Sequence, residues 1–576
     1  MKEKKLFESL SLVDDDLLAE ALPQKAKAPF SKRLLPILAA SFVLLLTVPL
    51  TLLFSFGFFE GGNAVTTHSA DYYHPYLTGT SPVNTQSPSK VEGSKPSGDL
   101  SFDVDDEFSS LLPTEPGMNS PSSSGGDSFT EIIENGFVST AENTKSFFSI
   151  DVSTASFPNI RSTIKNGAKP YKDAVRVEEM LNYFRYDYES AKDGSILALN
   201  ASLFDTPFNR ETKLLTVGLK AEEIEFSDVK NNLVFLIDVS GSMYDQNKLP
   251  LVQQAFIMLA ENLNDHDRVS IVTYAGDDRV ALAGAYGYEK EKITAVIEDL
   301  QAGGSTAGSE GIKTAYRLAQ EYFIEDGNNR VILMTDGDFN VGVTDNKSLE
   351  TFITEKRQTG VYFSVYGFGM GNWQADKMET LALNGNGAYG YIDSLKEARR
   401  ALVEEIGGSI VTVAKDVKAG LSFNPEYVES YRLIGYETKQ MSEDEFNNSE
   451  TDAGELGSGH TVTVVYELKM TDKALLDEGG DLGTVADVTL KYKTPDTSKD
   501  CETTLSISTA AYRKTLTAQD SFIAAVVEFA LILRDSEYKG DANLTDLIAR
   551  LNALTLDDEY KEEFREIVGI YAGLGQ

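Results

Sequence analysis

The 576-residue sequence has very little cysteine and histidine, the residues on which soft-metal sites and much acid–base catalysis depend. Its one cysteine, Cys501, cannot by itself form an internal disulfide, an Fe–S cluster or a thiolate zinc site. Two of its four histidines, His68 and His74, lie in a low-complexity tract. Only His266 and His460 remain for imidazole chemistry, which argues against Ser–His–Asp catalysis and multi-histidine metal sites.

Positive charge is also scarce. The chain has 52 Lys and Arg residues against 89 Asp and Glu residues, and its formal net charge is -37. Proteins that bind along nucleic acids need a basic surface to neutralise phosphates, so we expect no nucleic-acid partner. A metal ion or a cationic partner fits this balance better.

One long hydrophobic run is present, from Leu34 to Phe59, and it contains no charged residue. As a helix it would extend ~39 Å, enough to cross a bilayer core of about 30 Å with some tilt. Lys25, Lys27, Lys32 and Arg33 lie just before the run, and the next Lys or Arg is Lys90. The positive-inside rule therefore predicts a single-pass cell-membrane protein with residues 1–33 in the cytoplasm and the bulk of the chain outside. A cleaved signal peptide is the alternative, with residues 62–64 as a weak cleavage site.

Residues 60–130 are rich in Ser, Thr, Gly and Pro, and we expect a disordered linker there. After it, the hydrophobic patterning predicts an α/β fold: a doubly wound, mostly parallel sheet inserted in or flanked by a β-rich domain. The predicted regions are a β-rich N-terminal extension (137–228), an α/β domain (229–414), a β-rich region (415–512) and a C-terminal helical region (513–576). Within the last, residues 521–533 and 544–573 read as helices.

A group of oxygen-bearing side chains follows the strand-like run LVFLID. Asp238, Ser240 and Ser242 form a D-x-S-x-S pattern where this strand ends. Thr306 precedes a predicted helix, and Asp336 ends the apolar strand VILMTD. Ligands of open α/β sheets bind at the carboxyl ends of strands, so these residues can meet at one edge. Carboxylates and hydroxyls are hard donors that suit Mg²⁺, with Mn²⁺ or Ca²⁺ as alternatives, and do not suit zinc.

These three elements resemble, in residue type and in order, the metal-ion-dependent adhesion site of von Willebrand factor type A domains. The match spans about residues 232–414. Further strings on both sides, among them VRVEEMLNYFRYDY and SYRLIGYE, resemble a bacterial subfamily of A-domain proteins with N-terminal and C-terminal extensions. The resemblance implies that Ser240, Ser242 and Thr306 coordinate the metal through hydroxyls, and that Asp238 and Asp336 do so directly or through water.

The resemblance also implies function. Such domains mostly bind proteins, often through an acidic residue of the ligand that reaches the metal, and are not themselves enzymes. We therefore predict a membrane-anchored, extracytoplasmic protein for cation-dependent protein binding or adhesion. A metal-stabilised structural envelope protein and a metal-dependent hydrolase are the alternatives, and the second lacks an evident general base near the ion.

Overall fold

The computed structural model describes residues 127–574 with short gaps at 128, 151, 193, 225–229, 276–277, 305–308, 338–345, 370–373, 406–410, 475–479, 496–497 and 557. The predicted cytoplasmic tail, the membrane span Leu34–Phe59 and residues 60–126 of the predicted linker lie outside the described residues. Among the helices that are described, none is long and apolar enough to cross a membrane.

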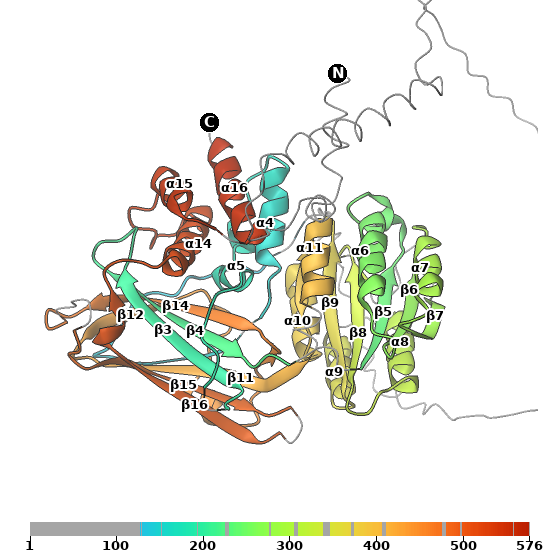
Figure 1. Ribbon diagram of the computed structural model, residues 1–576, viewed down its shortest axis with the longest axis horizontal. Coiled ribbons are helices and arrows are strands. Elements are labelled where there is room, and N and C mark those ends of the chain that lie inside the picture. The colour runs from blue at the N-terminus through green and yellow to red at the C-terminus, as the bar shows by residue number, and fades with distance from the viewer. Residues whose placement is uncertain are drawn as a thin grey trace, which may run out of the picture. The chain divides into compact units, whose positions relative to one another are not determined.

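The α/β domain is built on one six-stranded sheet with the order β10-β9-β8-β5-β6-β7 (Figure 1). Five strands are parallel, and β7 pairs with β6 in the antiparallel direction at the edge. Every residue of the central strands β5 and β8 is buried, which explains the apolar runs Leu233–Ile237 and Val331–Met334 within them. The strands are β5 (Asn231–Asp238), β6 (Arg268–Tyr274), β7 (Asp278–Tyr286), β8 (Asn328–Thr335), β9 (Val361–Phe368) and β10 (Tyr389–Ile392).

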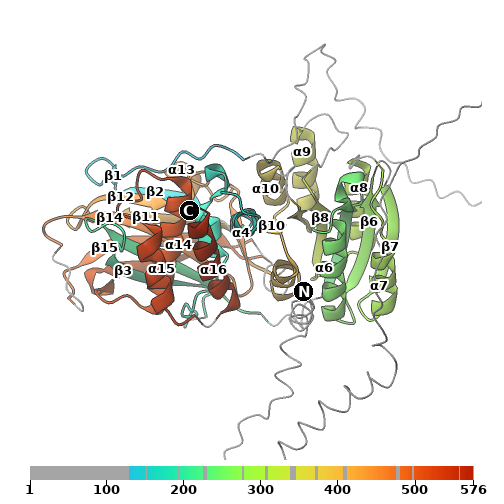
Figure 2. The same ribbon diagram turned by 90° about the horizontal axis from the view of Figure 1, so that it is seen from above.

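Helices cover both faces of this sheet (Figure 2). One face packs against α6 (Leu249–Asn262), α7 (Lys290–Glu298) and α11 (Leu395–Arg399), which continues into the π-helical turn η5 (Arg400–Glu404). The other face packs against α8 (Ser309–Glu321), α9 (Asn346–Arg357) and α10 (Ala375–Asn384). The doubly wound, mostly parallel sheet predicted from the sequence is confirmed; the antiparallel edge strand was not predicted.

The chain on both sides of this domain forms two further sheets. Their orders are β1-β12-β14-β4-β3-β17 and β13-β11-β15-β16, and β2 also pairs with β11. Strands from before and after the α/β domain are neighbours in both sheets, so the α/β domain is inserted in a β-rich domain. The strands are β1 (Val138–Ser139), β2 (Lys145–Ser149), β3 (Leu197–Asp205), β4 (Lys213–Ala221), β11 (Thr412–Phe423), β12 (Val428–Ile434), β13 (Gly454–Gly457), β14 (Thr461–Met470), β15 (Thr484–Lys493), β16 (Asp500–Ser508) and β17 (Tyr512–Arg513).

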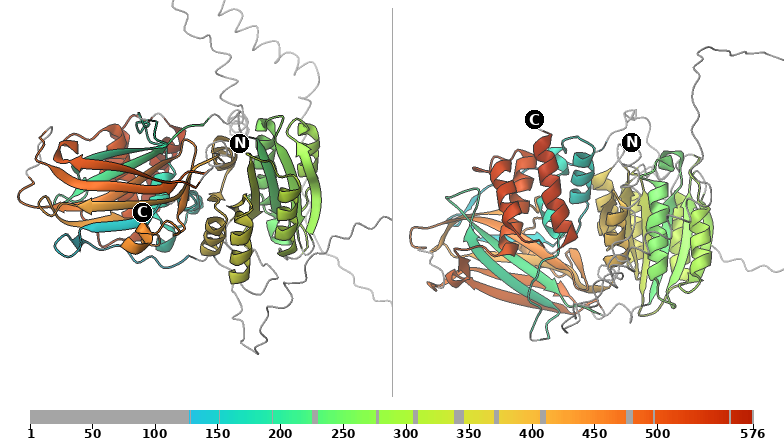
Figure 3. Two further views of the ribbon diagram at one scale, coloured as in Figure 1. Left: turned by 90° about the horizontal axis from the view of Figure 1, so that it is seen from below. Right: turned by 45° about the horizontal axis from the view of Figure 1, so that its top comes forward.

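The C-terminal helices pack with helices that precede the α/β domain around one apolar core (Figure 3). These helices are α4 (Ser156–Lys165), α5 (Val177–Asn182), α14 (Ala518–Arg534), α15 (Leu544–Ala553) and α16 (Glu559–Gly573). The segment 544–573, predicted as helical, forms two helices separated by a short break. The chain leaves the helical conformation at Leu554, and Asp558 caps the next helix by accepting a hydrogen bond from the Tyr560 backbone.

Buried Arg161 on α4 ties these parts together. Its guanidinium pairs with Glu397 of the inserted domain at 2.8 Å and with Glu563 of α16 at 3.0 Å, and it also pairs with Asp393. Its side chain is fully buried, so these carboxylates supply the compensation that a buried charge needs. The last helix of the inserted domain is thereby held against both the preceding and the following segments.

Candidate metal centre

Asp238 and Asp336 lie at the carboxyl ends of adjacent parallel strands. Ile237 of β5 is in register with Met334 of β8, so Asp238 stands beside Thr335, and Asp336 comes next. Asp238 is fully buried and Asp336 is 2% exposed. Asp238 Oδ2 accepts hydrogen bonds from Tyr274 Oη and Thr335 Oγ1, both at 3.2 Å. The structure therefore brings the two predicted carboxylates together at one sheet edge.

The environment of Asp238 disfavours its charged form. Burial raises its pKa to about 6, and the nearby Asp336 charge adds to that rise. Hydrogen bonds from Ser240 and Tyr274 act in the opposite direction and lower the pKa of Asp238. A cation at this edge would stabilise the ionised form of Asp238, so the two carboxylates favour the binding of a positive charge.

The two serines extend this oxygen cluster from the interior to the surface. The Ser240 backbone N–H donates to Asp238 Oδ1 at 2.8 Å, which fixes the turn after β5. The hydroxyls of Ser240 and Ser242 are 3.0 Å apart. Ser240 is buried, whereas Ser242, in the short helix η4 (Gly241–Tyr244), is exposed. Three of the five predicted ligands thus form a connected group that reaches solvent.

Thr306, the remaining predicted ligand, lies outside the described residues, but the chain just before it contacts the turn after β5. The Gly303 N–H donates to the Val239 carbonyl at 2.8 Å, and the Gly241 N–H donates to the Gly304 carbonyl at 3.2 Å. Gly304 has a φ of +88°, and a Cβ there would meet the Ala275 carbonyl at 2.7 Å. Glycine is therefore required where this loop approaches the site.

A lysine that sequence reasoning missed also belongs to the site. Lys248 Nζ donates to Asp336 Oδ2 at 2.8 Å, and both side chains are buried. Its aliphatic part lies against Gly369, where a Cβ would come within 2.5 Å of the lysine Cε. The ammonium compensates one of the two buried carboxylates. No local sequence pattern reveals this, because the pairing depends on how α6 begins relative to β8.

The donor set fits a hard divalent cation. The described ligand candidates are two carboxylates and two hydroxyls, without nitrogen or sulfur, which is the chemistry Mg²⁺ prefers. Within the described ranges no three His, Cys, Asp or Glu side chains form a metal-binding group, so any site here depends on the hydroxyls. Lys248 shows that a positive charge is already favourable at this position.

Some other side chains close to the predicted ligands in the sequence do not belong to the oxygen cluster. Asp245 is exposed in the loop that follows η4. Phe368, at the end of β9, is fully buried in the core beneath α6 and therefore does not face a partner. Asp338 and Trp373 lie outside the described residues.

Three family profiles match the chain. The family described as "von Willebrand factor type A domain" matches residues 232–404, which contain the inserted sheet and the site. The family described as "von Willebrand factor" matches residues 123–216. The family described as "Uncharacterized protein YfbK, C-terminal" matches residues 408–574, which follow the inserted domain.

Individual proteins agree with these matches. "Uncharacterized protein YfbK" of Escherichia coli is 42% identical over 359 residues, which cover 61% of this chain and 62% of that protein. The bovine "Inter-alpha-trypsin inhibitor heavy chain H3" is 26% identical over 196 residues, or 32% of this chain and 22% of that protein. The chain thus spans less than two thirds of either relative.

Among solved structures, "von Willebrand factor type A from Catenulispora acidiphila" aligns with 60% of this chain and 80% of that chain. The identity is 18% and the TM-score is 0.36, too low to support an argument of its own. The profile matches and the Escherichia coli relative support the resemblance read from the sequence. The chain thus contains a von Willebrand factor type A domain at residues 232–404, followed by a region that matches the C-terminal family of YfbK.

Proposed function

We propose that this protein binds another protein in a divalent-cation-dependent manner through the site formed by Asp238, Ser240, Ser242, Thr306 and Asp336. The observation that carries the proposal is the convergence of two buried carboxylates and a pair of hydroxyls at one sheet edge, with an ammonium already paired to Asp336. Buried like charges repel unless a cation lies nearby, so this edge favours cation binding.

In this proposal, different residues bind the ion and face the partner. Asp238 and Asp336 supply the negative charge, while Ser240 and Ser242 supply neutral oxygens and lead toward solvent. Two carboxylates balance a dication but do not saturate its coordination. The bound cation would supply an open position for a carboxylate oxygen of an Asp or Glu on the partner.

The surface beside Ser242 offers an apolar contact for such a partner. Tyr244 lies in η4 two residues after Ser242 and is 79% exposed. Tyrosine is enriched in protein interfaces because its ring is large and its hydroxyl can form a hydrogen bond at the rim. In this proposal the bond between the metal and the partner's carboxylate fixes the partner's orientation, and Tyr244 adds buried apolar area.

The proposal places this site outside the cell and does not include catalysis. The uncharged run Leu34–Phe59 and the basic residues before it support a single-pass membrane anchor with the A domain extracytoplasmic. Lys248, the basic group beside the carboxylates, is engaged with Asp336. A group occupied in that way is poorly placed to act as a general base.

Cross-linking on intact cells tests the proposal. Cells expressing the full-length protein would be cross-linked with and without EDTA, and the captured proteins compared between wild type, Asp238→Asn and Asp245→Asn. The first variant removes a buried charge of the site, and the second is a matched control because Asp245 is exposed nearby. We expect specific neighbours that are lost with EDTA and with Asp238→Asn but are retained with Asp245→Asn.

Two results would contradict the proposal. If folded Asp238→Asn captures the same neighbours as wild type, the metal has only a structural role. If the purified protein hydrolyses a captured neighbour and the variant does not, the site belongs to an enzyme.

A further inference from the structure

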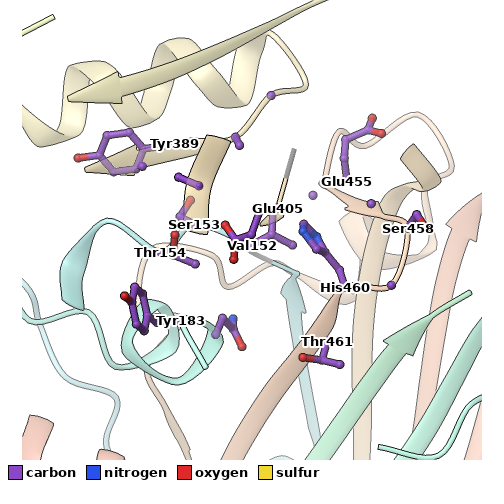
Figure 4. Close-up of a pocket in the computed structure, with 18 of the residues that line it drawn as sticks. Val152, Ser153, Thr154, Tyr183, Tyr389, Glu405, Glu455, Ser458, His460 and Thr461 are labelled. Atoms are coloured by element: carbon purple, nitrogen blue, oxygen red, sulfur yellow. The ribbon is translucent and has the colours of Figure 1, made fainter. Parts of the chain in front are cut away.

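A cavity that contains none of the metal-site residues is lined both by the inserted domain and by the segments that flank it (Figure 4). Its volume is about 480 Å³, within the range of small-molecule sites. It is lined by the segment before α4, the end of α5, strands β9 and β10, and the turn between β13 and β14. Arg330, one of the lining residues, precedes Asp336 on the same strand by six residues, or ~20 Å at about 3.3 Å per residue.

Three polar atoms of the lining are buried without a hydrogen-bond partner in the described part of the chain. They are Arg330 Nε, Glu455 Oε2 and His460 Nδ1. Buried polar atoms are nearly always paired in proteins, because an unmade hydrogen bond costs free energy. Three such atoms around one cavity indicate that something polar occupies it.

Arg330 is the most unusual of the three. Six arginines are buried among the described residues, and five of them, Arg161, Arg176, Arg400, Arg432 and Arg534, lie within 4 Å of a carboxylate. Arg330 is 3% exposed and has no carboxylate at that distance. One of its terminal nitrogens donates to Ser364 Oγ at 2.8 Å, and its guanidinium lies 5.4 Å from the ring centre of Tyr362. Among the described residues, Arg330 is therefore the one buried arginine without an ion pair within 4 Å, and Glu455 interacts with it electrostatically from farther away.

The other two atoms can also act as donors. Burial raises the pKa of Glu455 to about 8, so its carboxyl holds a proton at neutral pH. Its Oε1 accepts from the amide of Asn386, which leaves Oε2 for the O–H. Burial lowers the pKa of His460 to about 4, so its ring is neutral and carries one N–H. Glu455 is also close enough to Arg330 for the two groups to interact electrostatically, so one acceptor group could take hydrogen bonds from both residues.

We propose that this cavity binds a small organic carboxylate whose charged end meets Arg330 and Glu455. The ring-bearing residues Tyr183, Tyr366 and Tyr389 also line the cavity and suit an aromatic body for the ligand. A monoanion fits better than a phosphate dianion. Among the described lining residues, Arg330 is the one buried arginine without an ion pair, since Arg400 is paired with Glu397 and Glu405; Arg185, which also lines the cavity, is exposed.

Isothermal titration of the full-length protein with matched ligand pairs tests this site. Each pair is an aromatic carboxylate and its uncharged amide: benzoate with benzamide, phenylacetate with phenylacetamide, and N-benzoylglycine with its amide. Phenyl phosphate tests the dianion. We expect at least one carboxylate to bind at least tenfold more tightly than its amide and than phenyl phosphate.

Variants locate the binding. Arg330→Gln should weaken carboxylate binding at least tenfold, whereas Arg317→Gln should not, because Arg317 is exposed on α8 and pairs only with Glu321. Should Arg330→Gln fail to fold, Glu455→Leu and Glu455→Gln replace it. The leucine removes the donor and should weaken binding, and the glutamine retains an N–H donor and should preserve it.

Three results would overturn the proposal: no binding by any carboxylate of the panel, equal binding of carboxylate and amide, or unchanged carboxylate binding in folded Arg330→Gln. Because the cavity and the metal centre are separate, the same titrations in EDTA should give the same affinities. Failure here would therefore leave the proposed adhesive function untouched.

Discussion

Replacing Lys248 by methionine should tighten binding of Mg²⁺ or Mn²⁺. In the structure the Lys248 ammonium pairs with buried Asp336 at 2.8 Å and so competes with any cation for that carboxylate. Methionine keeps the apolar stem that packs against Gly369 but removes the charge. The variant then holds the two buried carboxylates, Asp238 and Asp336, without the Lys248 ammonium.

The size of the effect follows from Coulomb's law. A dication and an ammonium ~8 Å apart repel by ~4 kcal/mol at an effective dielectric constant of about 20. A lysine that swings away when the metal binds would relieve much of this. Because 1.4 kcal/mol corresponds to tenfold in affinity, we expect Lys248→Met to bind metal between about tenfold and about a thousandfold more tightly.

Isothermal titration with MnCl₂ and MgCl₂ on the full-length protein measures this change. Lys313→Met is the matched control, since Lys313 is exposed on α8 and pairs with Glu310 at 3.0 Å. The metal-free variant should also unfold at a lower temperature than wild type and regain stability when Mg²⁺ is added. Equal or weaker metal binding by Lys248→Met would refute the idea that this ammonium occupies the place of the cation.

Three further predictions follow. Arg161→Met should lower the free energy of unfolding by about 3 kcal/mol, because it leaves buried Asp393 and Glu397 without this partner; a loss under ~1 kcal/mol in denaturant titrations would contradict the account. In the wild type, folded Glu455 keeps its proton between pH 4.5 and about 8 while the unfolded chain loses it, so the free energy of unfolding should fall by up to about 1.4 kcal/mol per pH unit as the pH rises through that window. Glu455→Gln should remove this fall. The same pH profile of stability in wild type and variant would contradict the prediction. Tyr244→Ala should reduce partner capture on cells while Mn²⁺ affinity stays at the wild-type value, and equal capture would remove Tyr244 from the interface.

The inserted sheet could be predicted from the sequence because its central strands are buried on both faces and carry unbroken apolar runs, Leu233–Ile237 and Val331–Met334. The strand β11 could not. Asp416 within it has a φ of +52°, and the register with β15 shifts between Lys415 and Lys418. This irregularity breaks the alternation of apolar and polar residues that marks a strand. Likewise, α4 carries Pro158 in its first turn, where proline is tolerated but discourages a helix prediction.

The candidate site likewise has some features that local sequence predicts and others that depend on contacts between distant segments. The spacing of Asp238, Ser240 and Ser242 and the strand end at Asp336 are local features, and the sequence was sufficient to group them. Lys248 and the cavity lined by Arg330 depend on contacts between distant segments. His460 lies in a turn as predicted, but nothing near it in the sequence indicates that its ring lines a cavity with Arg330.

Anomalous diffraction from crystals grown with Mn²⁺ tests the central claim most directly. A single strong peak should lie within about 2.5 Å of oxygens from Asp238 or Asp336 and from Ser240 and Ser242, with Thr306 as the remaining protein ligand and the Lys248 ammonium displaced from Asp336. A map without a peak at this edge, with Lys248 still paired to Asp336, would contradict the account.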